Sequence, residues 1–419
     1  MLLLLLLVAI DEPESSSEPT AVEEWVVPPS EPPLFGALVP PFSAWVAGSA
    51  AHVKLRPQAN APTIGVVRGG DMVVVKSCVP SCDAEHAWAL LDPMGAMALA
   101  ALRTSDISPE RLRQATFVHF QYGSVQVKKL EILRNPNESA AVVARGKKGD
   151  VLAFVDDETV APPGWLLRPG GGYARAANVK LARPSAFFGV HDPAGALAFA
   201  LHALTLPLGG AIARHGWFRV EGVRGNRVLV AGGSVPRSAV RLAFHRHRPL
   251  SVPPGRPWVH VDLREQVLTA YEGDKWVLAT LISSGRAGHV TLPGTFRVQQ
   301  KVAHTAMSRS KYFVDEVPFI QYFNKSQALH GAFWHDNFGT PVSHGCVNLS
   351  IADALWLFDW SKPELPAGWQ SLVPFNANLD SLWVAVEKAP ALGVFEPVPA
   401  AEIGGVGDMG TEAVEVSTH

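Results

Sequence analysis

Several features that would mark common classes of protein are missing from this sequence. Only three of its 419 residues are cysteine, and neither the zinc motif His-Glu-x-x-His nor the phosphate loop Gly-x-x-x-x-Gly-Lys-Ser/Thr occurs. Charged residues make up only 18% of the chain against 47% hydrophobic residues, which excludes a mostly disordered protein. Glycine and proline are abundant (36 and 34), but no Gly-x-y period accompanies them, so collagen is excluded. Short strands and many turns are favoured, in roughly three domains.

The chain also lacks an apolar run long enough to span a bilayer, which takes about 20 residues. The run Leu2–Ile10 is shorter and fits the apolar core of a signal peptide, although it has no basic flank and no clear cleavage site. We therefore expect residues 1–10 to be a signal-peptide remnant of an exported protein of the periplasm or cell envelope, with no integral membrane span. The alternative is an apolar N-terminus that carries no targeting signal.

Basic residues are absent from both ends of the chain. No Lys or Arg precedes Lys54 or follows Lys388, whereas these ends hold seven and five acidic residues. Residues 11–43, rich in Pro and Ser, are predicted to be an acidic linker, and residues 389–419 a flexible acidic tail. The body between them keeps 36 basic and 26 acidic residues, a net charge of +10.

Two segments of the front half resemble each other. The Gly-Asp pairs that begin at Gly70 and Gly149 are 79 residues apart, and Trp88 and Trp165 are 77 apart. We take Gly95 of the first segment and Gly171 of the second, which follow these tryptophans, as equivalent positions. Short alternating apolar runs broken by Gly, Pro and Asp are typical of small antiparallel β-barrels. Residues 44–115 and 116–185 resemble bacterial SH3-like modules, which often sit beside cell-wall enzymes; an unrelated β-domain duplication is the alternative.

Residues 186–255 are harder to interpret, and a third β module with a linker is one interpretation. Ala194 to Leu206 could be a short helix or an apolar loop. Residues 217–220 and 227–230 are expected to be strands. The basic stretch 245–249 lacks interleaved aromatic residues and a known binding motif, so no nucleic-acid partner is expected.

The three cysteines divide into a close pair and a single residue. Cys78 and Cys82 lie four residues apart, and in an oxidising compartment they are expected to form a disulfide. A metal site with His86 would need a second ligand pair at zinc-like spacing, which is missing, so no metal is expected. Cys346 is left alone.

Cys346 lies among residues that suit a nucleophile. A catalytic thiol needs a base within hydrogen-bond reach, and both His330 and His344 are candidates. Gly345 allows close approach of a substrate carbonyl. The sequence Ser350-x-x-Asp353 before an apolar run predicts a capped helix whose N-terminus would favour the thiolate. The alternative, a buried inert thiol, leaves these neighbours unexplained.

The sequence Ser343-His344-Gly345-Cys346-Val347-Asn348 is the SHGCxN signature of the L,D-transpeptidase (YkuD-like) catalytic domain, and residues 256–388 resemble that family. Ser283-Ser-Gly and Thr291-Leu-Pro-Gly-Thr-Phe resemble two further family elements; many relatives carry Arg at the position of Asn348. The resemblance implies a mainly β chain: a β-sandwich catalytic domain preceded by small SH3-like β-barrel modules. It implies no cofactor.

The family's chemistry implies a role for each residue of the signature. The Cys346 thiolate would attack a peptidoglycan stem tetrapeptide, with His330 as base and the Gly331 carbonyl as its orienting group. N–H groups of Gly345 and Cys346 would hold the oxyanion, and the loop would be shaped by Ser343, His344 and Asn348. The thioester would pass to the amine of a second stem peptide (3→3 cross-link) or protein. Water as acceptor would make an L,D-carboxypeptidase, and a non-catalytic wall-binding protein is a further alternative.

Several neighbouring residues are weaker candidates for substrate contact. Met307 and Tyr322 fall where relatives carry a lid over the site, and Trp334 and His335 lie between the two catalytic positions; a structural role for His335 is equally compatible. The family is acylated by carbapenems, and the +10 body suits an anionic wall polymer. A Cys-His endopeptidase is disfavoured because its Cys precedes its His, and a sortase because its Cys motif differs. The protein is expected to be a monomer.

Overall fold

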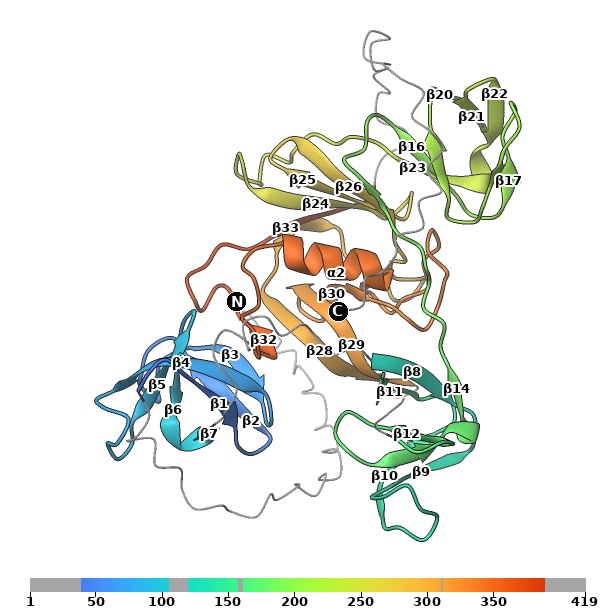
Figure 1. The fold of residues 1–419 in the computed structure, drawn as a ribbon. Helices are drawn as coiled ribbons and strands as arrows, with labels where there is room; N and C mark the ends of the chain where they lie inside the picture. The colour runs from blue at the N-terminus through green and yellow to red at the C-terminus, as the bar shows by residue number, and fades with distance from the viewer. Residues whose placement is uncertain (1–38, 105–119, 157–160, 310–311, 389–419) are drawn as a thin grey trace, which may run out of the picture. The chain divides into compact units, whose positions relative to one another are not determined.

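The structure is a computed structural model that describes residues 39–104, 120–156, 161–309 and 312–388. The predicted signal-peptide remnant, the linker up to residue 38 and the acidic tail from 389 lie outside the described residues. The chain divides into two compact units, one holding residues 118–181 and the other residues 34–117 and 182–419. As expected, the described chain is mainly β (Figure 1). None of its described helices is long and apolar enough to cross a membrane.

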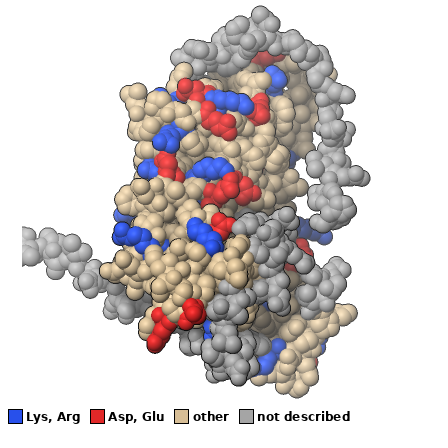
Figure 2. Space-filling model, turned by 60° about the vertical axis from the view of Figure 1, so that its left-hand side comes forward, with Lys and Arg blue, Asp and Glu red and all other residues tan. Residues whose placement is uncertain are grey.

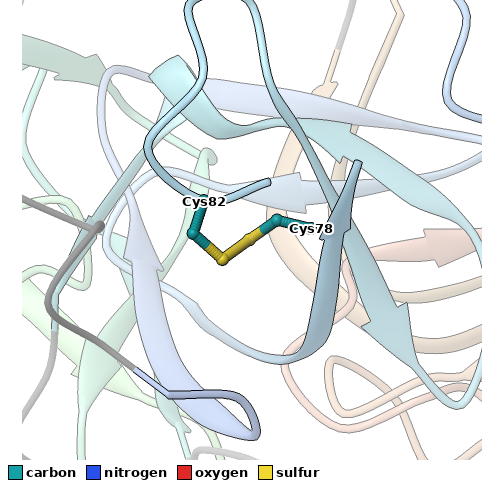
Figure 3. The surroundings of a disulfide bond; sticks show 2 residues. All are labelled: Cys78 and Cys82. Carbon is teal, nitrogen blue, oxygen red and sulfur yellow. A yellow bond between two sulfur atoms is a disulfide. The ribbon is translucent and has the colours of Figure 1, made fainter. Parts of the chain in front are cut away.

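The first module is a set of antiparallel strands around an apolar core. Its first strand begins two residues inside the predicted linker and pairs with both the fourth and the last strand of the module. The strands are β1 (Phe42–Val46), β2 (Ala50–Lys54), β3 (Thr63–Arg68), β4 (Met72–Val79), β5 (Trp88–Asp92), β6 (Ala96–Ala98) and β7 (Leu102–Thr104), with a 3-10 turn at Leu99–Ala101. They lie in the order β3-β2-β6-β5-β4-β1-β7. The predicted Cys78–Cys82 disulfide is confirmed, with Cα atoms 5.0 Å apart (Figure 3).

The second module, in the other unit, repeats this pairing internally. Its first strand again pairs with the fourth and the last, and its second with the third and sixth. The strands are β8 (Phe120–Val125), β9 (Lys129–Leu133), β10 (Val142–Lys147), β11 (Val151–Val155), β12 (Trp165–Leu167), β13 (Tyr173–Arg175) and β14 (Val179–Leu181), with a 3-10 turn at Ala176–Asn178. The duplication is real; whether its members are SH3-like stays a prediction.

One detail of the predicted repeat is wrong. The equivalent of Gly95 is Gly172 rather than Gly171, because a Cβ at either glycine would meet matching neighbours. At Gly95 these are Val53 and Ile64; at Gly172 they are Ile132 and Val143. Gly171 and Gly172 both have positive φ, so the sequence alone could not separate them.

Residues 186–255 form a third β module, joined to the catalytic domain by its leading strand. The predicted strands near 217 and 227 are confirmed, whereas Ala194–Leu206 holds two short strands joined by loop residues and no helix, because residues 197–200 pair with two strands farther along the chain. The strands are β15 (Val190–His191), β16 (Leu197–Ala200), β17 (Leu204–Thr205), β18 (Ala211–Ile212), β19 (Trp217–Arg219), β20 (Gly222–Arg224), β21 (Arg227–Val230), β22 (Gly233–Pro236) and β23 (Val240–Ala243), with a 3-10 turn at Arg237–Ala239.

The catalytic domain has two sheets with a helix between them. The first contains, with β15, β24 (Pro257–Asp262), β25 (Val267–Glu272), β26 (Lys275–Leu281), β27 (Gly294–Arg297) and β33 (Trp383–Glu387). The second contains β28 (Gln300–Arg309), β29 (Tyr312–Asn324), β30 (Gln327–Gly331) and β31 (Val347–Leu349). Helix α2 (Ile351–Trp360) lies between them (Figure 1), and one apolar core joins all three through residues such as Val259, Leu329 and Leu357.

Within the larger unit, a short strand joins the first module to the catalytic domain. Strand β32 (Ser371–Leu372) pairs with β28 on one side and with β3 on the other. Trp369 and Leu372 are buried in the core of the first module. The catalytic domain therefore completes the core of that module.

The basic body shows no single basic patch on the face drawn in Figure 2, where Lys and Arg side chains lie among Asp and Glu side chains. Ion pairs such as Arg297–Asp380 and Arg246–Asp262, at 2.7 and 2.9 Å, combine the two signs locally. On that face the basic side chains are thus interspersed with acidic ones.

Candidate active site

The pairing of two short strands brings the two main candidate residues to one place. Strands β30 and β31 are parallel, with His330 opposite Asn348. Cys346 directly precedes β31, two residues before Asn348. Cys346 is half-buried, and its Sγ lies 3.6 Å from the Ser326 carbonyl oxygen. The strand pairing therefore brings the segment that contains Cys346 next to the strand that contains His330.

His330 is held in the form that a general base requires. Its side chain is 2% exposed, and its Nδ1 lies 3.0 Å from the Gly331 carbonyl oxygen, the expected orienting group. Because a carbonyl only accepts, Nδ1 carries the proton and the neutral ring presents the Nε2 lone pair. Burial lowers the His330 pKa to about 4, against a smaller opposing effect of the Gly331 hydrogen bond. The imidazole is therefore neutral near pH 7.

Gly331 has no room for a side chain. A Cβ there would lie 2.8 Å from Ile351 Cδ1 and 3.2 Å from Pro318 Cγ. The glycine thus lets the start of α2 and strand β29 pack directly against the residue that orients His330.

The loop before Cys346 is closed by hydrogen bonds from small polar side chains. Ser343 Oγ donates to the Cys346 carbonyl at 2.6 Å and accepts from the Gly345 N–H at 3.1 Å. Thr291 Oγ1 donates to the Gly345 carbonyl at 2.9 Å. The φ of Gly345 is +120°, which favours glycine. The expectation that the Gly345 N–H holds the oxyanion needs revision, since Ser343 already accepts from that group.

His344, the other candidate base, is half-buried in a basic cluster. Its Nε2 lies 2.8 Å from Nη2 of Arg286, and its ring centroid is 4.6 Å from that of His289. These contacts fit the expected loop-shaping role better than a role as base. His289 was not predicted from the sequence to lie near this loop.

His335 contacts β31, the strand that directly follows Cys346. Its Nε2 lies 2.8 Å from the Asn348 side-chain amide, and its Nδ1 accepts from the Asn337 N–H at 3.1 Å. The ring of Trp334 lies 5.8 Å from that of His330, centroid to centroid. Burial lowers the His335 pKa to about 4, so this second imidazole is also neutral near pH 7.

The third module holds the loop that contains His335. Arg214 pairs with Asp336, with Nη1 and Oδ2 2.9 Å apart, and Arg241 Nε donates to the Gly339 carbonyl at 2.8 Å. A Cβ at Gly339 would lie 2.4 Å from Leu201 Cδ2. The accessory module thereby fixes the segment between the two catalytic positions.

The β28–β29 hairpin supplies the two candidate lid residues. Tyr322 is half-buried; burial raises its pKa, and the neighbouring negative charge of a Cys346 thiolate raises it further. This places Tyr322 beside the nucleophile. Met307 lies farther along the hairpin, opposite Val314.

Gln327 was missed by sequence reasoning. Its Nε2 donates to the Val290 carbonyl at 3.0 Å, and its Oε1 accepts from the Leu292 N–H at 3.2 Å. It therefore ties the loop that contains Thr291 to β30. A polar residue two positions after a turn carries no sequence signal for such a contact.

The predicted helix cap is confirmed. Ser350 Oγ accepts from the Asp353 N–H at 3.1 Å at the start of α2. The buried Asp353 carboxylate accepts from Thr280 Oγ1 at 2.6 Å and from the Gly189 N–H at 2.9 Å. The positive end of the helix thus lies four residues after Cys346, where it favours a thiolate. Within the described ranges, no group of three or more metal-ligating side chains gathers.

Comparison with known proteins shows which family this segment resembles. Residues 256–376 match the family model YkuD, described as an L,D-transpeptidase catalytic domain. The resemblance inferred from the SHGCxN signature is thereby confirmed.

Two relatives show how far the similarity extends. The chain is 28% identical over 123 residues to a putative L,D-transpeptidase, YciB, of Bacillus subtilis (strain 168), covering 24% of this chain and 59% of that protein. It is 26% identical to the crystal structure of an L,D-transpeptidase from Stackebrandtia nassauensis, covering 31% and 55% of the two chains with a TM-score of 0.24. The chain thus spans little more than half the length of these relatives. A complex of the L,D-transpeptidase LdtMt1 with imipenem is 19% identical, covering 39% and 77%, with a TM-score of 0.26.

Proposed function

We propose that the protein is a peptidoglycan L,D-transpeptidase that works through a Cys346 thioester. The observation that carries the proposal is the neutral, buried His330, oriented by the Gly331 carbonyl on the strand beside the Cys346 segment, inside the segment that matches the YkuD family model. Cys346 is the thiol outside the disulfide. A nucleophile, a base and a group that orients the base are thus all supplied by this chain.

Acylation follows from these positions. His330 Nε2 takes the thiol proton, and the thiolate attacks the carbonyl between the third residue of the stem tetrapeptide and its terminal D-Ala. The C–N bond breaks, D-Ala leaves with the proton from His330, and a thioester to Cys346 remains. The Cys346 N–H serves the oxyanion; Gly345 can add a second donor only by leaving Ser343.

Deacylation returns the thiol. A side-chain amine of a second stem peptide attacks the thioester carbonyl, gives its proton to His330 and forms a 3→3 cross-link, while the Cys346 thiolate leaves. Tyr322, Trp334, His335 and Met307 line the approach to the thioester. The donor and acceptor are wall polymers, so the protein acts in the cell envelope, on the periplasmic side where one exists.

Incubation with tetrapeptide muropeptides tests this proposal. We expect the wild-type protein to produce 3→3 dimers and free D-Ala, and Cys346→Ala to produce neither. Tripeptides without dimers would identify an L,D-carboxypeptidase that uses water. Binding of muropeptides without any product would identify a wall-binding protein and overturn the proposal.

Imipenem gives an independent check on the nucleophile. Intact-protein mass should show one adduct on the wild type, absent from Cys346→Ala. His330→Gln should retain the fold and lose acylation by about 100-fold or more, since general-base catalysis is worth that much. An adduct that survives Cys346→Ala would show that another residue is the nucleophile.

A further inference from the structure

An arginine of the first module reaches into the catalytic domain. Arg68 ends β3, and its Nη1 and Nη2 each lie 3.1 Å from one carboxylate oxygen of Glu316 on β29. Nη2 also donates to the His304 carbonyl at 3.2 Å. Two parallel N–H···O bonds fix both the distance and the orientation of the pair. The side chains are 32% and 13% exposed, so water screens this pair less than it screens an ordinary surface ion pair.

The backbone at Glu316 is in an unusual conformation. Its φ is +45°, and that of Phe319 is +58°, a region that non-glycine residues avoid. Such conformations persist only where the surroundings hold them. Burial alone would raise the Glu316 pKa, but hydrogen bonds and charges from His304 and Arg68 lower it to about 2. The Glu316 carboxylate is therefore ionised at neutral pH, and its ion pair with Arg68 is present there.

The backbone segment Glu316–Phe319 packs against Gly331, whose carbonyl oxygen accepts the hydrogen bond from His330. Pro318 lies between Glu316 and Phe319, and its Cγ would be 3.2 Å from a Cβ at Gly331. The Gly331 carbonyl accepts from His330 Nδ1. A continuous line of contacts thus runs from Arg68 through Glu316 and Pro318 to His330.

We infer that Arg68 of the first module is a positioning residue for the reaction at Cys346, because it holds the Glu316–Phe319 backbone against Gly331 and so fixes the direction of the His330 ring. The inference rests on the proposed function of His330 and Cys346. The first module is held to the rest of the larger unit beside this contact, because its strand β3 pairs with β32 and its core contains Trp369. Through Arg68, the first module therefore supports the orientation of His330, in addition to any wall ligand.

The test measures the rate at which imipenem acylates Cys346 in the full chain, by intact mass against time. Arg68→Ala should slow acylation about tenfold, since small misplacements of catalytic groups cost one to two orders of magnitude. Glu316→Gln should slow it similarly, and the double variant should be no slower than either single one. Arg68→Lys keeps the positive charge but loses the bidentate hydrogen-bond geometry, so its acylation rate should lie between those of the wild type and Arg68→Ala.

A matched control separates positioning from a general loss of stability. Arg103 belongs to the same module, and its guanidinium donates to the Ala100 and Leu102 carbonyls. Arg103→Ala should acylate within about twofold of wild type under conditions where all variants are folded by circular dichroism, since surface substitutions have small effects. Hydrogen exchange of the 328–331 amides should quicken in Arg68→Ala and not in Arg103→Ala.

The outcomes distinguish this inference from the proposed function. If the wild type is acylated and Arg68→Ala and Arg68→Lys match it in rate and in exchange, the inference is wrong and the proposed function stands. If the wild type is not acylated at all, the proposed function fails, and the inference fails with it.

Discussion

The first and second modules share the pairing of their first and second strands, but the residues of their third strands differ, and two of these differences concern contacts with the rest of the larger unit. A shift of 79 residues carries β3 onto β10, with the bulge in the same place: Val53 faces Gly65 in one module, and Ile132 faces Ala144 in the other. Under the same shift Arg68 corresponds to Lys147. The first module thus has a glycine and an arginine where the second has an alanine and a lysine.

Both differences fall where the first module meets the catalytic domain. A Cβ at Gly65 would lie 2.5 Å from the Ser371 carbonyl oxygen and 2.5 Å from ring atoms of Trp369. Arg68 makes the forked contact to Glu316. The comparison teaches that only the first of the two similar modules has, at these two positions, the residues that contact the predicted catalytic domain, and the following predictions test this difference.

Removing the Trp369 ring should have the largest effect. Its side chain is 3% exposed within the core of the first module, so Trp369→Ala should lower the free energy of unfolding by about 4 kcal/mol. Trp369→Phe is the control, because it keeps an aromatic ring in the site and should cost much less. Chemical denaturation checks both. Equal stability of Trp369→Ala and wild type would show that the ring is not part of that core.

Gly65→Ala should have a smaller effect, of about 2 kcal/mol, because the added methyl group forces Ser371 and Trp369 away. The φ of Gly65 is not in the left-handed region, so the loss would come from the contact rather than from the backbone. The matched change in the second module, Ala144→Gly, should cost less than about 1 kcal/mol, the usual price of glycine in a strand. Equal losses at the two positions would contradict the proposed specialisation.

Loss of the Arg68–Glu316 contact at low pH should have the smallest effect on the free energy of unfolding. The Glu316 pKa is lowered from 4.5 to about 2, so its contribution is complete above about pH 4.5 and is lost as the pH falls through 2. Glu316→Gln should be less stable than wild type at pH 7 by about 1.5 kcal/mol. That difference should shrink between pH 4.5 and 2 in thermal unfolding. A difference that is constant over this range would show that the carboxylate charge is not involved.

The sequence predicted the features that local patterns encode. The SHGCxN signature located the catalytic domain, Ser350-x-x-Asp353 marked the start of α2, and the spacing of Gly70 and Gly149 revealed the duplicated β modules. The signature and the helix cap are each set by residues within a few positions of one another, and the duplication is visible because two similar local patterns recur 79 residues apart.

Contacts between distant segments could not be predicted in this way. Arg68 and Glu316 are 248 residues apart, and nothing near either residue marks the other. Residues 197–200 form a strand because of their partners β19 and β23, whereas the composition of this segment is equally compatible with a helix. The hydrogen bond from the Gly345 N–H to Ser343 depends on the conformation of the loop, which the signature does not specify.

The most direct test of the account is to trap the thioester on Cys346. The protein is mixed with a tetrapeptide muropeptide whose side-chain amine is acetylated, so that it can act only as a donor; the mixture is quenched in acid, and the intact mass of the protein is measured. We predict a gain equal to the donor minus D-Ala, located on the peptide that contains Cys346 and absent from Cys346→Ala. No gain in the wild type while D-Ala is released, or the same gain in Cys346→Ala, would contradict the assignment of Cys346 as the nucleophile.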